Sequence, residues 1–157
     1  MRIDIGGLGR SFHWAARGVC LALRERNFRI HLTAACYVTA AGFLADLSRA
    51  EIAVLCLCFG LVTAAELVNT AIETLCDRVT RQHDPMIRDA KDIAAGAVLM
   101  TALFSAAVGL VLFAHPAPIR AILTKLTQHI WIDALLLASV PAAVAFVFAV
   151  EQKGEPK

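Results

Sequence analysis

The chain has 157 residues, of which 59% are hydrophobic and 18% charged, and its mean hydropathy is +0.67. This apolar fraction lies far above that of soluble domains, and the length fits a single domain. A formal net charge of +2 gives no basis for nucleic-acid binding, so no nucleic-acid partner is expected. The five cysteines are interpreted as small apolar packing residues.

The N-terminal segment, residues 1–29, predicts an amphipathic helix on a membrane surface. Three arginines spaced by sevens share one helical face, and apolar side chains recur at helical spacing on another. The arginines are Arg10, Arg17 and Arg24, and the apolar residues are Phe12, Ala16, Val19 and Leu23. An alternative interpretation makes this segment the first turns of a long first transmembrane helix.

Four apolar segments follow, at residues 30–47, 52–76, 93–114 and 130–150. A helix needs ~20 apolar residues to cross a bilayer, and the first segment is near the short end of that range. The pattern predicts an all-α integral membrane helical bundle. We expect a three-span core over residues 30–114, followed over residues 115–157 by an extra loop and a fourth, C-terminal transmembrane helix.

The placement of lysine and arginine predicts the orientation of the spans. Of the 15 basic side chains, six lie in residues 1–29, four in residues 77–92 and two in residues 151–157. The two opposite loops hold three, which are Arg49, Arg120 and Lys125. We therefore expect a multi-pass protein of the inner (cytoplasmic) membrane, with both termini and the loop at residues 77–92 in the cytoplasm.

The stretch "AELVNTAIE", residues 65–73, follows an apolar run without charge and places carboxylates inside the second span. Glu66 and Glu73 differ by only ~20° around a helix and by about 10 Å along it, and Asp77 lies on the same stripe. A charged residue there costs at least ~2.5 kcal/mol, which indicates a function. The alternative is a structural carboxylate paired with an arginine of the surface helix.

The neighbouring sequence indicates phosphate chemistry. Lys91 and Asp92 lie at the entrance of the third span, and Asp84-Pro85 predicts a capped helix start before them. Carboxylate oxygens suit magnesium, which usually accompanies phosphates, and basic side chains suit phosphate charge.

Two motifs carry a family resemblance. "ELVNTAIETLCDRV", residues 66–79, and "HDPMIRDAKDIAAGAVL", residues 83–99, resemble the prokaryotic integral-membrane diacylglycerol kinase and undecaprenol kinase family. "SFHWAARGVCLALRERNFRIHL", residues 11–32, resembles its surface helix and entry into the first span. The resemblance covers roughly residues 10–114.

The resemblance implies a lipid kinase that uses ATP and Mg²⁺ to phosphorylate the primary hydroxyl of a membrane lipid. It also implies a homotrimer whose active sites are shared between neighbouring protomers. Glu66 would be the general base near the lipid hydroxyl, and Glu25 and Glu73 would bind the metal. The residues that would complete the site around the phosphates and the lipid headgroup are Asn69, Asp77, Lys91 and Asp92.

Two features depart from the family pattern. His31 stands where the diacylglycerol-specific branch typically has a glutamate, which favours a polyprenol such as undecaprenol over diacylglycerol. The chain after about Ala114 has no counterpart in a usual three-span member.

Two other functions remain open at the level of the sequence. One is a small four-span proton-coupled transporter with an intramembrane Glu. It would not need Asn69, Glu73, Asp77 or the Lys91-Asp92 pair at the rim. The other is a degenerate kinase that serves as a membrane structural subunit. The presence of an acidic residue at every position where the family pattern expects one argues against it.

The charge distribution generates a testable prediction. Single cysteines introduced at positions 84 and 157 should react with a membrane-impermeant thiol reagent only after the cytoplasmic side is opened, whereas a cysteine at position 120 should react in intact cells. The variants are made on a background without the native cysteines. A C-terminus that reacts from outside would mean that residues 130–150 do not cross the membrane.

Overall fold

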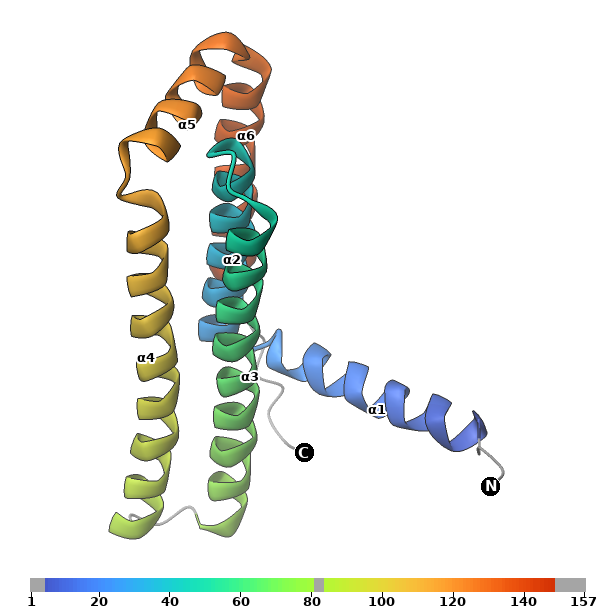
Figure 1. Cartoon of the computed structure of the whole chain (residues 1–157). Coiled ribbons are helices and arrows are strands. Elements are labelled where there is room, and N and C mark those ends of the chain that lie inside the picture. Colours follow the sequence, from blue (N-terminus) through green and yellow to red (C-terminus); the bar gives the residue numbers. More distant parts are fainter. Residues whose placement is uncertain (1–4, 81–83, 149–157) are drawn as a thin grey trace.

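The computed structural model describes residues 5–80 and 84–148, and these residues form six helices and no strand. The helices are α1 (Ile5–Ala22), α2 (Arg26–Leu44), α3 (Arg49–Val79), α4 (Pro85–Phe113), α5 (Pro116–Gln128) and α6 (Ile130–Phe148). Helices α2, α3, α4 and α6 run alongside one another, α5 covers one end of this bundle, and α1 projects from its side (Figure 1). The predicted all-α class is confirmed.

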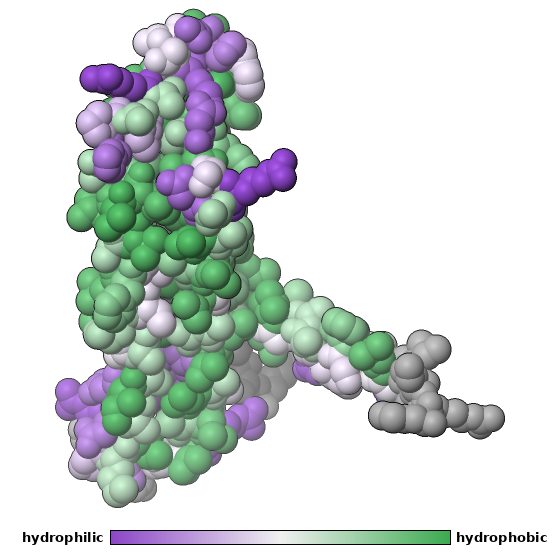
Figure 2. Space-filling view, in the orientation of Figure 1, coloured by the Kyte–Doolittle hydropathy of each residue, from purple (hydrophilic) through white to green (hydrophobic). Residues whose placement is uncertain are grey.

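The surface has the pattern of a membrane protein. Within the described residues, α3, α4 and α6 are each long and apolar enough to cross a bilayer. Many large apolar side chains are exposed, and green apolar residues dominate the middle of the bundle while purple polar residues gather towards its ends (Figure 2). The predicted helical membrane bundle is confirmed, with three of the four predicted spans meeting the criterion of length and hydropathy.

Helix α2 contains residues 30–44 of the first predicted span, which was expected to reach residue 47, and is not among those three helices. Asn27, Arg29 and His31 lie in its first two turns and lower its hydropathy. The prediction that α2 crosses the bilayer, made from its apolar segment, is therefore not confirmed by length and hydropathy, although α2 runs beside α3 in the bundle (Figure 1).

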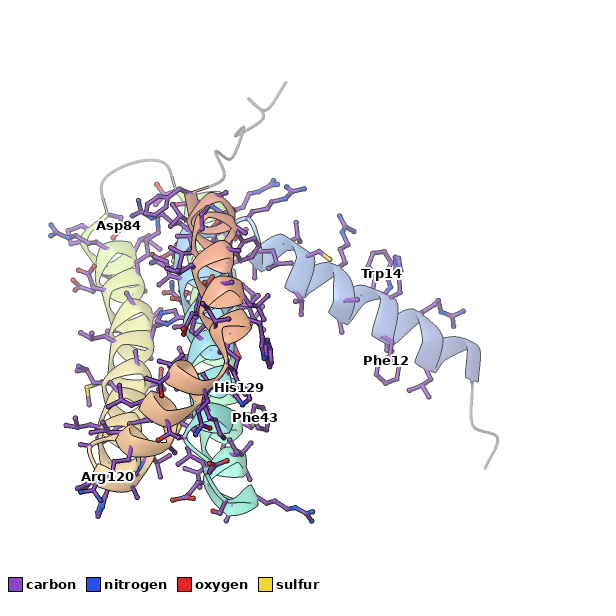
Figure 3. The ribbon with its side chains drawn as sticks, turned by 90° about the horizontal axis from the view of Figure 1, so that it is seen from above. Phe12, Trp14, Phe43, Asp84, Arg120 and His129 are labelled. Carbon is purple, nitrogen blue, oxygen red and sulfur yellow. The ribbon has the colours of Figure 1, made fainter. Side chains whose placement is uncertain are left out.

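Helix α1 ends at Ala22, and a turn separates it from α2, so the two do not form one long transmembrane helix. The predicted surface helix is therefore shorter than residues 1–29, and residues 26–29 belong to α2. Phe12 and Trp14 point to opposite sides of α1 (Figure 3), and the Arg17 guanidinium lies 5.5 Å from the centre of the Trp14 ring. One side of α1 thus carries Phe12, and the other carries the pair of Arg17 and Trp14.

The third helix of the core starts as the sequence predicts. Asp84 caps α4 by accepting hydrogen bonds from the backbone N–H of Met86 (2.9 Å) and Ile87 (3.5 Å), and Pro85 occupies the first helical position.

The segment predicted as an extra loop contains a helix, α5. Pro116 begins it, and Ile119, Ile122 and Leu126 form an apolar stripe along it. The loop assignment at residues 115–129 was therefore wrong. The apolar stripe is short and interleaved with polar residues, so it resembles a loop in the sequence.

The C-terminal helices are attached to α2 at three levels. Lys125 on α5 donates to the Phe43 carbonyl (3.2 Å) and to Asp46 Oδ1 (2.6 Å) at the end of α2. Tyr37 and Ser139 share a hydrogen bond of 2.8 Å between α2 and α6. Nearer the start of α2, buried Arg29 donates from Nε to the Val147 carbonyl at 3.3 Å.

Candidate active site

The predicted polar stripe of α3 lies in the packing seam of that helix. Its buried positions include Leu55 and Val62 and continue with Glu66, Asn69 and Cys76, at helical spacing. Glu66 is 3% exposed and Asn69 is 8% exposed, whereas Glu73 is half-buried. The stripe therefore runs from buried Glu66 through half-buried Glu73 to exposed Asp77, in the predicted order. We call this exposed end of the stripe the rim of the site.

Glu66 has a partner on α2. His31 Nε2 lies 3.2 Å from Glu66 Oε1, and the His31 side chain is about one-quarter exposed. Burying a carboxylate without a partner is costly, so this contact explains how Glu66 is accommodated at its position. The sequence analysis used His31 only as a marker of the substrate and missed this contact, because the two residues lie on different helices.

One turn further along α3, an amide and a carboxylate interact. Asn69 Nδ2 donates a hydrogen bond to Glu73 Oε1 at 3.0 Å. The other amide atom, Asn69 Oδ1, is buried and has no hydrogen-bond partner. A buried acceptor left without a donor costs free energy unless a ligand satisfies it. The Asn69 oxygen therefore suits a donor or a cation brought by a ligand.

Two ion pairs lie at the rim of the site. Lys91 on α4 donates to Asp77 Oδ1 on α3 and so connects the two helices. Arg88 Nε lies 3.7 Å from Asp92 Oδ2 within α4, with both side chains largely exposed. The structure therefore brings Asp77 and Lys91 together and engages Asp92 with its own helix.

The two predicted metal ligands lie on different helices. Glu25 is exposed at the N-cap position of α2 without a side-chain capping bond. Glu73 lies on α3 seven residues after Glu66, whereas Glu25 precedes α2, the helix that carries His31. In residues 5–80 and 84–148, no cluster of three or more His, Cys, Asp or Glu side chains could hold a metal by itself.

This arrangement fits magnesium delivered with a nucleotide. Mg²⁺ is usually held by one or two carboxylates together with substrate phosphates, and it takes oxygen ligands. Glu25 and Glu73 are carboxylates of this kind, and the unsatisfied Asn69 oxygen lies beside Glu73.

Known proteins resemble the chain over this same region. A sequence model of the family described as prokaryotic diacylglycerol kinase matches residues 13–113. An undecaprenol kinase of Bacillus subtilis is 42% identical over 113 residues, which cover 71% of this chain and 92% of that relative. A diacylglycerol kinase of Synechocystis is 42% identical over 101 residues, covering 63% of this chain and 58% of that protein. No solved structure matches.

The His31–Glu66 contact generates a prediction about stability. His31→Ala should lower the unfolding midpoint in detergent, because it leaves a buried carboxylate without its partner at a cost of ~1–3 kcal/mol. The same change in a Glu66→Gln background should cost less, because the neutral amide is easier to bury. The control is His129→Ala, at an exposed histidine. Additive losses from the two substitutions would contradict the contact.

Proposed function

The chain belongs to the prokaryotic diacylglycerol kinase family and is a membrane lipid kinase, and we propose that it transfers the γ-phosphate of ATP to the primary hydroxyl of undecaprenol or diacylglycerol. The observation that carries this proposal is the α3 stripe, in which buried Glu66 precedes the Asn69–Glu73 pair. His31 and the undecaprenol kinase relative favour a polyprenol. The transporter alternative is not supported by the similarities.

In the proposed reaction, Glu66 is the general base. The lipid oxygen attacks the γ-phosphorus, the bond between this phosphorus and the β–γ bridging oxygen breaks, and ADP leaves. Glu66 accepts the hydroxyl proton as the new P–O bond forms. His31, 3.2 Å from the Glu66 carboxylate, holds it in position.

The residues at the rim would neutralise the negative charge of the phosphates. Glu25 and Glu73 would hold Mg²⁺, which when bound offsets the negative charge of the triphosphate. Lys91, paired with Asp77, supplies a positive charge beside the transferring phosphoryl group. Asn69 and Asp92 complete the polar surround of the phosphates and the lipid headgroup.

The proposal includes location and assembly. The protein would lie in the inner (cytoplasmic) membrane with both termini in the cytoplasm, as the distribution of basic residues indicates. It would form a homotrimer, in which a neighbouring protomer adds to each active site.

The direct test is phosphoryl transfer by the purified protein. With Mg²⁺ and ATP labelled in the γ-phosphate, label should appear in the lipid, and undecaprenol and diacylglycerol are assayed in parallel micelles. Undecaprenol should react faster, because His31 replaces the glutamate of the diacylglycerol branch. Label in neither lipid would refute the proposed substrates, and ATP consumed without a labelled lipid would indicate another acceptor.

The two glutamates of the stripe should respond differently to substitution. Glu66→Gln keeps the size of the side chain but removes the base, so the rate should fall ~100 to 10,000-fold while nucleotide binding survives. Glu73→Gln removes a charged ligand of a hard cation, so the rate should fall but recover in part as magnesium is raised. The measurement is initial rate against magnesium concentration at saturating lipid, with nucleotide binding measured alongside.

Glu51→Gln is the matched control, since Glu51 lies at the other end of α3 in the capping box with Ser48. Its magnesium dependence should equal that of the unsubstituted protein. If magnesium rescues Glu66→Gln instead of Glu73→Gln, the two roles have been assigned the wrong way round.

A further inference from the structure

A partly open apolar cavity of about 810 Å³ lies between α2, α3 and α4, and α5 and α6 contribute to its wall. This volume lies within the ~300–1,000 Å³ typical of ligand pockets. The hydroxyls in its wall are already engaged within the protein. Thr63 donates to the Phe59 carbonyl (2.8 Å), Ser105 donates to the Thr101 carbonyl (2.8 Å), and Tyr37 bonds to Ser139. The cavity therefore suits a hydrocarbon.

The two ends of the cavity differ in chemistry. His31, which contacts Glu66, lies in the wall near the start of α2. Leu44 lies in the wall near the end of α2, about 20 Å further along the helix at ~1.5 Å per residue. Ile122 and Leu126 of α5 belong to this second end, where Lys125 attaches α5 to the last turn of α2. The cavity thus leads from the proposed base to α5.

We propose that this cavity holds the hydrocarbon chain of the lipid substrate, and that α5 is its end wall and sets the chain length that is accepted. The proposal rests on the proposed function, since it places the lipid hydroxyl at the His31–Glu66 end. Helix α5 lies outside residues 13–113, the part of the chain that matches the family. The C-terminal extension is therefore a specificity-determining element added to a lipid kinase core.

A pair of glycine substitutions tests the cavity. A Cβ atom added at Gly109, in the cavity wall, or at Gly60, exposed on α3 and outside that wall, would meet no atom within 4 Å. Leucine at either position also raises helix propensity, so both variants should fold. Gly109→Leu should lower kcat/KM for a long linear polyprenol relative to a short one by on the order of tenfold, because it fills the cavity. Gly60→Leu should leave that ratio unchanged.

Substitutions on α5 in the full chain test the end wall itself. Ile122→Ala and Leu126→Ala, both in the cavity wall, should raise kcat/KM for a long polyprenol relative to a short one, because they lengthen the cavity. An unchanged long-to-short ratio in these two variants, or an equal ratio in the two glycine variants, would overturn the proposal.

A photoreactive alcohol locates the chain independently of catalysis. A polyprenol with a diazirine at its far end should label α5, near Ile122 and Leu126, in the full chain. Labelling confined to side chains outside the cavity would refute the proposal. So would a change in oligomer mass caused by Gly109→Leu, which would identify a helix of a second copy as the occupant. If no lipid is phosphorylated but α5 is labelled, the proposed reaction fails while the cavity assignment stands.

Discussion

The buried carboxylate of Glu66 is the constraint on which the arrangement of the other helices depends. At 3% exposure it occupies a packing position of α3 where an apolar side chain would ordinarily lie. It is accommodated there because α2 lies close enough to place His31 Nε2 3.2 Å away. The position of α2 is fixed in turn by α3 on one side and by its bonds to α5 and α6 on the other. Helices distant in sequence therefore contribute to the surroundings of a single side chain.

The polar groups at the rim contribute little to stability. The Arg88–Asp92 and Lys91–Asp77 pairs involve exposed carboxylates, and such pairs are typically worth 0 to ~1 kcal/mol. Contact between α3 and α4 depends instead on buried apolar side chains such as Val62, Ala94 and Val98. The charges at this end can therefore rearrange without loosening the helix pair. The proposed function, in which a triphosphate would bind and leave in each cycle, would need this separation of roles.

Local patterns in the sequence predicted much of this structure. The stripe of Glu66, Asn69 and Glu73 follows from helical periodicity alone, and the cap at Asp84 follows from side-chain chemistry. The sequence could not predict the His31–Glu66 contact or the Lys91–Asp77 pairing geometry, because each depends on how two helices pack. Helix α5 was missed for another reason. Its apolar stripe is short, and the side chains of Ile122 and Leu126 find apolar neighbours only where α5 packs over the end of the bundle.

Arg29 has a consequence for the biosynthesis of the chain. Its guanidinium donates to the Leu23 and Arg24 carbonyls at the corner between α1 and α2, and also to the Val147 carbonyl, 118 residues later. During synthesis the last of these acceptors does not yet exist when α1 and α2 emerge. The hydrogen bond between Arg29 and Val147 can therefore form only after the last turn of α6 has been synthesised, so the contact that joins the start of α2 to α6 is made late.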